Sequence, residues 1–158
     1  MPKVLIIHYS ESGNTKKMAE YIAEGMKKEE DIEVEVKPVN EANVDELPSA
    51  DGIVIGSPTY YGSMAAEIKK FIDESIKYHG RLEGKVGGAF SSSANIGGGN
   101  ETTIMDILKA FLIHGMVVQG TSKGDHYGPV AIEMPDDRSR KLCIEYGQRI
   151  ARLVLRTR

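Results

Sequence analysis

The chain has 158 residues, of which 41% are hydrophobic and one, Cys143, is a cysteine. This length suits one domain with a single well-formed core, and a lone cysteine excludes an internal disulfide framework. The formal net charge of −3, from 20 basic and 23 acidic side chains, argues against nucleic acid as the main partner. Because neither a secretion signal nor a membrane-spanning apolar stretch is recognisable, we expect a cytoplasmic protein without membrane insertion.

The first apolar run, Lys3–Tyr9, predicts a buried parallel strand, and apolar residues at helical spacing predict a helix over Asn14–Lys28. Between them lies Ser10–Thr15, which is rich in hydroxyl groups and contains Gly13. The amino end of a helix offers unpaired backbone N–H groups and a positive dipole, so this loop is suited to bind a phosphate. The alternative is an ordinary N-cap turn, because helix starts prefer the same residue types.

Two phosphate-binding motifs are absent from the loop, and their absence limits the class of phosphate ligand that it can bind. No lysine follows Gly13, which excludes a Walker A loop, and the pattern G-x-G-x-x-G of dinucleotide folds is absent. A loop without cationic side chains suits the terminal phosphate of a monoester, held by neutral donors.

The rest of the chain alternates apolar runs with helical patterns. Further strands are predicted at Ile32–Val36 (an edge strand), Asp51–Gly56, Lys85–Phe90 and Met116–Val118, with a short apolar run at Val130–Ile132. Helices are predicted over Met64–Tyr78 and Glu101–His114 and from near Pro135 to the end, and Asn40–Ser49 is expected to be a connecting loop.

Five strands alternating with four helices predict an α/β fold, a doubly wound five-stranded parallel sheet in three layers, with strand order 2-1-3-4-5. Residues 1–158 are expected to form one domain. In this order the carboxyl ends of strands one, three and four adjoin. The loops Ser10–Thr15, Pro58–Ser63 and Ser91–Gly99 should therefore meet on one rim of the sheet.

These loops resemble known flavin-binding segments. The Ser10–Thr15 loop is similar to the FMN-phosphate loop of the flavodoxin-like superfamily. Pro58–Met64 and Ser92–Glu101 resemble the second and third flavin loops of the WrbA-type FMN-dependent NAD(P)H:quinone oxidoreductases, and His114–Val118 and Tyr127-Gly128 match that group too. The resemblance covers nearly the whole chain.

The resemblance implies FMN as cofactor and names its contacts. The residues that would hold the phosphate are Ser10, Glu11, Ser12, Gly13, Asn14 and Thr15. Those that would line one side of the flavin ring are Pro58, Thr59, Tyr60, Tyr61 and Gly62. Those that would cover the pyrimidine edge of the ring are Ser93, Ala94, Asn95, Ile96, Gly97 and Gly98. Independently, a planar electron-poor ring favours aromatic walls, and N–H groups of a glycine-rich loop stabilise negative charge on it. Taken singly, the two tyrosines are ordinary at a strand end and the glycines ordinary in a flexible turn.

The histidines depart from the WrbA-type pattern. That group has two consecutive histidines before the Gly-Met-Val run, whereas this chain has Ile113 and His114, so the histidine nearest the flavin is missing. We expect His114 to be a cationic residue at a helix end. His126 is the remaining candidate catalytic residue, with Tyr127 beside it as a candidate ring contact; the alternative is a solvated loop histidine.

The main functional hypothesis is two-electron transfer from NAD(P)H through FMN to a quinone, in a homodimer or homotetramer and without a metal site. The alternative is a flavodoxin that carries single electrons between protein partners, and a third class is a module in which flavin is structural or absent. A carrier surrounds its flavin with negative charge. The sequence indicates only Glu11 near the flavin, with Asp125 as a further contributor, and this favours the reductase.

Overall fold

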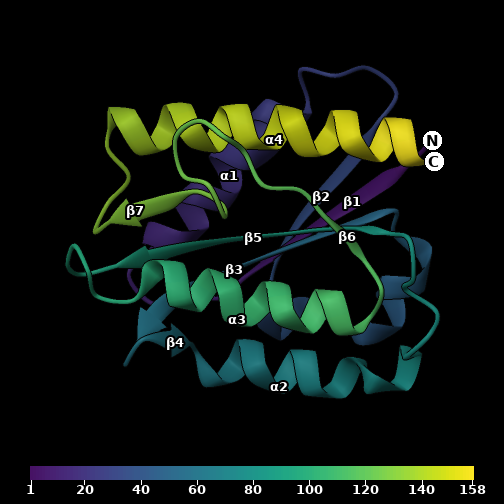
Figure 1. Cartoon of the computed structure of the whole chain (residues 1–158), viewed down its shortest axis with the longest axis horizontal. Helices are drawn as coiled ribbons and strands as arrows, with labels where there is room; N and C mark the ends of the chain where they lie inside the picture. The colour runs from purple at the N-terminus through teal and green to yellow at the C-terminus, as the bar shows by residue number, and fades with distance from the viewer.

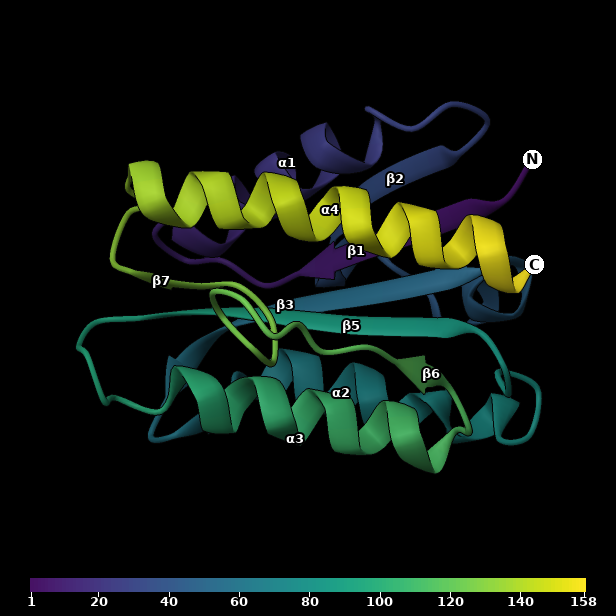
Figure 2. The same ribbon diagram turned by 45° about the horizontal axis from the view of Figure 1, so that its top comes forward.

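The computed structural model describes all residues, Met1–Arg158, as a parallel sheet with helices on both faces (Figures 1 and 2). The sheet order is β2-β1-β3-β5-β6, which confirms the doubly wound topology. The strands are β1 Lys3–His8, β2 Glu33–Pro38, β3 Gly52–Tyr60, β4 Ser63–Met64, β5 Val86–Ser93, β6 Val117–Val118 and β7 Val130–Ile132. The helices are α1 Asn14–Met26, α2 Ala66–Glu74, α3 Asn100–Ile113 and α4 Asp137–Thr157, with short 3-10 helices η1 Val39–Glu41, η2 Val44–Ser49 and η3 Ser75–Tyr78. None of the helices is both long and apolar enough to cross a bilayer.

Two hydrophobic cores hold the layers together, one on each face of the sheet. Successive residues of β1 point to opposite faces: Val4 and Ile6 pack under α1 and α4, whereas Leu5 and Ile7 pack against the α2 and α3 side. A strand that is buried on both faces must be apolar throughout, which explains the continuous apolar runs in the sequence. The sheet is therefore fixed between two helix pairs, and its carboxyl edge is left for loops.

The fifth position of the sheet is shared by two short strands. β6 pairs with Val86–Gly87 at the start of β5, and β7 pairs with Ser91–Ser93 at its end, both in parallel. The predicted fifth strand and the short apolar run after it thus occupy one position, separated by residues 119–129. Asp125 fixes this loop by accepting a hydrogen bond from the N–H of Val130 (3.0 Å) and by pairing with Arg138.

Strands β3 and β5 run well past the ends that the sequence predicts, and both extensions reach the carboxyl rim. β3 continues through Pro58 to Tyr60, and β5 continues to Ser93. Ser57 and Pro58 pair with Ser91 and Ser92, and β4 continues the sheet as a hairpin with Thr59 and Tyr60. A serine hydroxyl adds a bond between the two extensions, since Ser91 donates to the carbonyl of Ser57 (2.8 Å).

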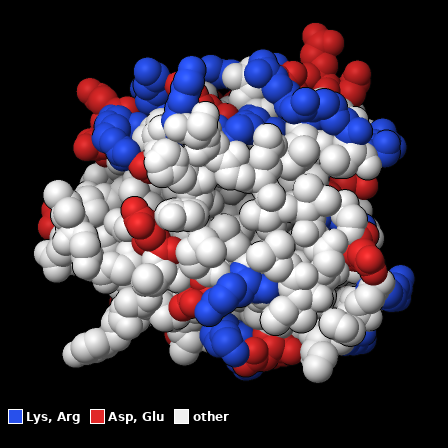
Figure 3. All heavy atoms as spheres, in the orientation of Figure 1, with Lys and Arg blue, Asp and Glu red and all other residues white.

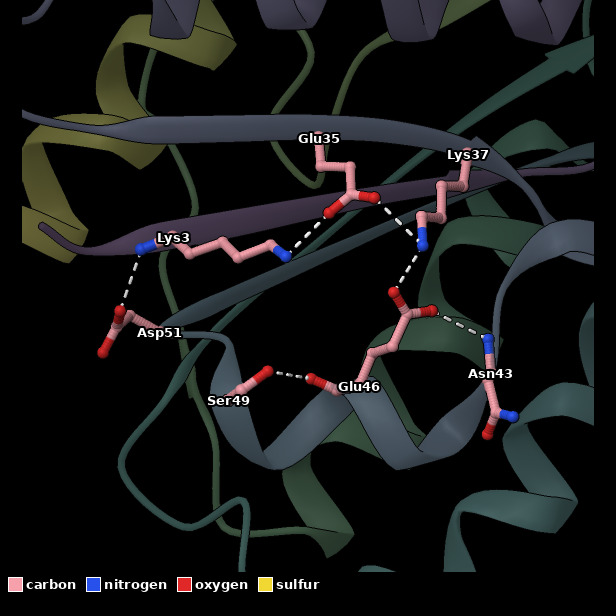
Figure 4. A network of polar contacts seen from close by, with 7 residues as sticks. All are labelled: Lys3, Glu35, Lys37, Asn43, Glu46, Ser49 and Asp51. Atoms are coloured by element: carbon pink, nitrogen blue, oxygen red, sulfur yellow. Dashed lines mark hydrogen bonds and ion pairs between the residues drawn. The ribbon is translucent and has the colours of Figure 1, made fainter.

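The segment Asn40–Ser49, expected to be a loop, is mostly 3-10 helix. η2 begins with a capping box: the side chain of Asn43 accepts from the backbone, and Glu46 accepts from the N–H of Asn43 (2.9 Å). Glu46 also pairs with Lys37 on the edge strand β2 (Figure 4). The segment is therefore held by local hydrogen bonds and by one ion pair to the sheet.

Alternating charges cover the exposed edge strand. Glu35 lies between Lys3 (2.7 Å) and Lys37 (2.9 Å), and hydrogen bonds to both lysines lower the pKa of its carboxyl group (Figure 4). Charged side chains on an edge strand oppose pairing with a further chain. Other basic side chains gather along the upper edge of Figure 3. The sequence of α4 contains six basic residues, Arg138, Arg140, Lys141, Arg149, Arg152 and Arg156.

Candidate functional site

The loop after β1 leaves the start of α1 without a side-chain cap. Gly13 is the N-cap residue, in a left-handed conformation (φ 94°), and no side chain accepts a hydrogen bond from the first turn. Ser10 instead accepts from the N–H of Gly13 (3.0 Å). A Cβ at Gly13 would meet nothing within 4 Å, so glycine serves the backbone conformation rather than a close approach. None of the hydroxyl and amide side chains of the loop acts as a cap, so the N–H groups of the first turn stay available for an anion.

The three predicted loops meet at one cavity of about 280 Å³. Its lining comes from the start of α1, the ends of β3 and β5, and the residue after β7: Glu11, Ser12, Asn14, Thr15, Pro58, Thr59, Tyr60, Ser92, Ser93, Ala94 and Glu133. The lining contains two carboxylates and no lysine, arginine or histidine. Donors in this cavity are therefore neutral, and the formal charges around it are negative.

Buried hydroxyl groups connect the elements beneath the cavity. Thr15 Oγ1 of α1 lies 2.8 Å from Ser92 Oγ of β5. Thr59 Oγ1 lies 2.9 Å from Ser91 Oγ and 3.2 Å from the hydroxyl of Thr103 in α3. Since each bond joins segments far apart in the sequence, the cavity floor is held in one arrangement before any ligand arrives.

The second and third loops lie in direct contact. Thr102 Oγ1 donates to the carbonyl of Gly62 (2.6 Å), and Gly99 lies so close to Gly62 that a Cβ there would be 2.6 Å from its Cα. Ser93 donates to the carbonyl of Asn95 (3.0 Å) and accepts from the side-chain amide of Asn100 (3.1 Å). The contacts of Gly62 set the spacing of the two loops, and those of Ser93 order the third loop.

Exposed aromatic and acidic groups surround the outer end of the cavity. Tyr61 is fully exposed in a left-handed conformation (φ 49°), and Tyr60 is partly exposed. The hydroxyl of Tyr9 donates to Glu11 (3.0 Å). Burial and then the charges of Glu11 and Glu67 raise the pKa of Tyr60, which marks this rim as electronegative.

A family model described as a flavodoxin domain matches residues 5–110. The chain belongs to the flavodoxin family. It is 40% identical over 162 residues to a flavodoxin of Aquifex aeolicus (strain VF5), covering 98% of this chain and 88% of the relative. It is 35% identical over 157 residues to a flavodoxin of Clostridium saccharobutylicum, covering 96% and 97%. A solved flavodoxin, WrbA-like protein from Agrobacterium tumefaciens is similar over 100% of both chains, with a TM-score of 0.85 and 26% identity.

The flavodoxin family implies FMN, and the cavity suits that cofactor. The uncapped first turn of α1, the hydroxyls of Ser12 and Thr15 and the amide of Asn14 form a donor set for a phosphate monoester. Tyr60 and Ala94 provide walls for an aromatic ring farther out. The residues present thus fit both the charged and the planar part of FMN.

The cavity brings together part of the predicted site. Nine of the predicted residues line it, namely Glu11, Ser12, Asn14, Thr15, Pro58, Thr59, Tyr60, Ser93 and Ala94. Ser10 and Gly13 shape the phosphate loop from its other side, where they line a neighbouring groove. The lining does not include Tyr61, Gly62, Asn95, Ile96, Gly97, Gly98 or Tyr127.

Neither candidate histidine lines the cavity. His126 Nδ1 lies 2.9 Å from the carbonyl of Thr121 within its own loop, and the ring of Tyr127 meets the His126 ring edge-on. His114 follows the far end of α3, a helix about 21 Å long, from the third loop. It is buried with Nε2 2.8 Å from Ser75 Oγ, and burial together with His79 lowers its pKa. The expectation of a cationic His114 is therefore wrong, because packing favours the neutral ring.

Sequence reasoning missed Ser92 and Glu133 as cavity residues. Ser92 belongs to a strand extension that no local pattern distinguishes from a loop. Glu133 follows β7 in a left-handed conformation (φ 58°), and its N–H donates to the carbonyl of Ser93 (2.8 Å). Only the pairing of β7 with β5 brings it to the cavity, so the signal lies in the strand register and not in a motif.

Proposed function

We propose that the protein is an FMN-binding carrier that passes single electrons between protein partners. The observation that carries this proposal is a cofactor cavity lined by two carboxylates and no cation. When bound, FMN supplies reversible acceptance of one or two electrons. Carboxylates close to it oppose the build-up of negative charge that a second electron brings. The two relatives named flavodoxin support the same function.

We further propose that the whole chain is one FMN-binding domain in which each loop has a separate task. Ser10–Thr15 would hold the phosphate, Pro58–Gly62 one side of the ring, and Ser93–Gly98 the pyrimidine edge. The uncapped first turn of α1 supports the first task. The hydrogen bond from Thr102 to Gly62, which holds the two ring loops together, supports the other two.

Negative charge near the flavin is greater than the sequence indicates. Glu11 and Glu133 line the cavity, and Glu67 lies close enough to raise the pKa of Tyr60 together with Glu11. A scarcity of acidic residues around the flavin therefore no longer argues for a reductase. Asp125 is instead bonded to the N–H of Val130 and paired with Arg138.

A second candidate function is two-electron transfer from NAD(P)H through FMN to a quinone. The similarity to the WrbA-like structure over the full length of both chains favours it. The positions of the histidines argue against this candidate, since neither His114 nor His126 lines the cavity. Assembly as a homodimer or homotetramer stays a prediction tied to this candidate.

Two assays test the proposal in order. Apoprotein is titrated with FMN and followed by quenching of flavin fluorescence, and we expect one FMN per chain. The loaded protein is then given NADH or NADPH with a quinone, and we expect no turnover above that of free FMN. A protein that leaves FMN fluorescence unchanged would exclude both candidates, whereas rapid NAD(P)H oxidation dependent on the quinone would favour the reductase.

A further inference from the structure

We infer that Ser92 is a positioning residue for the cofactor phosphate, acting through the hydroxyl of Thr15. The inference rests on the proposed FMN site. It concerns how the phosphate loop is prepared, because Ser92 belongs to β5 and lies 77 residues away from Thr15.

The two hydroxyls form an isolated buried pair. Thr15 is 1% exposed and Ser92 is 4% exposed, and their oxygens are 2.8 Å apart. This is the only hydrogen bond that either hydroxyl makes within the protein. Both side chains line the cavity, so the direction of the bond can respond to what the cavity holds.

Which of the two hydroxyls donates to the other depends on where the proton of Thr15 is used. Each hydroxyl has one proton, so whichever group donates to the other has none left for a ligand. Thr15 is the second residue of α1, beside the uncapped N–H groups where an anion is most stable. A phosphate there takes the proton of Thr15, and Ser92 must then donate to Thr15. This second bond also strengthens the first, because hydrogen bonds in a chain polarise one another.

The adjacent Ser91 provides a matched contrast. It is also buried and also bonded to a threonine, Thr59 (2.9 Å), but its hydroxyl lies 2.8 Å from the carbonyl of Ser57. A carbonyl can only accept, so the proton of Ser91 is used within the protein whether or not a ligand is bound. Removing the Ser91 hydroxyl should therefore disturb the cavity without singling out the phosphate.

The test compares FMN with riboflavin, which has the same ring and polyol but no phosphate. Dissociation constants of both flavins are measured by fluorescence quenching for the parent protein, Ser92→Ala and Ser91→Ala. We expect Ser92→Ala to weaken FMN roughly fivefold, because Thr15 keeps its bond to the phosphate but loses the neutral hydrogen bond that orients and polarises its hydroxyl, and to leave riboflavin within about twofold. Ser91→Ala should change both affinities by the same factor.

A double variant separates action through Thr15 from direct contact. In the Thr15→Ala background, the further change Ser92→Ala should alter FMN affinity by less than about twofold. Two results would overturn the inference. One is that Ser92→Ala leaves the ratio of FMN affinity to riboflavin affinity unchanged. The other is that Ser92→Ala weakens FMN as much in the Thr15→Ala background as in the parent protein. If the parent protein does not bind FMN, the proposed function itself fails, so the two failures are distinguishable.

Discussion

The two ends of the cavity are built differently. At the inner end, which we assign to the phosphate, Thr15 and Ser92 are buried and bonded to each other. At the outer end, which we assign to the ring, Tyr60 of the lining is 41% exposed, and the adjacent Tyr61, which lies outside the lining, is fully exposed. A buried, pre-arranged donor set supplies affinity at little entropic cost, whereas an exposed edge leaves the ring accessible to a partner. This division of the cavity supports the proposed electron carrier, in which tight cofactor binding and an accessible ring are both required.

The largest effect is expected from a negative charge at the inner end. Ser12→Asp puts a carboxylate beside the phosphate, and we expect FMN affinity to fall on the order of 100-fold or more through like-charge repulsion. Riboflavin binding should be nearly unchanged. Titration with both flavins measures this, with Ser122→Asp on the exposed loop as the control; equal FMN affinity in Ser12→Asp and parent would remove the phosphate assignment.

At the outer end, Gly99→Ala should weaken both flavins together. Its Cβ would lie 2.6 Å from the Cα of Gly62, and the residue has a φ of 110°, so the two ring loops must separate. We expect a loss of roughly 2–3 kcal/mol in binding for FMN and riboflavin alike. Gly97→Ala is the matched control, because its φ is also positive but a Cβ there meets nothing within 4 Å. A loss confined to FMN would mean that this loop serves the phosphate instead.

A smaller and selective effect is expected from Thr15→Ala. Loss of one donor to a charged acceptor should cost on the order of 1–2 kcal/mol in FMN binding and nothing in riboflavin binding. Calorimetric titration of both flavins measures the difference. Equal losses would indicate that Thr15 supports the fold of α1 and not the phosphate.

The smallest change concerns the reduction potential. Glu133→Gln removes one carboxylate from the cavity lining, and we expect the potential for the second electron to rise by roughly 60 mV, a tenfold change for a one-electron step. Spectroelectrochemical titration of the FMN-loaded protein measures this potential. Glu101→Gln, on the exposed first turn of α3 and outside the lining, is the control. If the potential for the second electron rose equally in both variants, Glu133 would not be closer to the flavin than an exposed glutamate.

Local patterns were sufficient to predict the sheet and the meeting of its loops. Continuous apolar runs predict buried parallel strands, and right-handed crossovers then leave few strand orders. The loop Ser10–Thr15 is also local, since a strand end, a glycine and a helix start are consecutive in the chain. The segment Asn40–Ser49 was within reach as well, because Asn43 and Glu46 have the spacing of a capping box.

The features that could not be predicted from the sequence depend on contacts between distant segments, above all on the register of paired strands. Ser92 meets Thr15 only because β5 extends past Phe90, and a serine run has no pattern that separates strand from loop. Glu133 reaches the cavity only because β7 pairs with the end of β5. The lowered pKa of His114 follows from burial and from the nearby His79, which lies at the end of another helical segment.

The most direct test of single-electron transfer is anaerobic titration of the FMN-loaded protein with substoichiometric dithionite, followed by visible absorbance. With carboxylates around the flavin, we predict that the one-electron-reduced form accumulates before full reduction begins. Direct passage from oxidised to fully reduced FMN would contradict the carrier function and would favour the two-electron reductase.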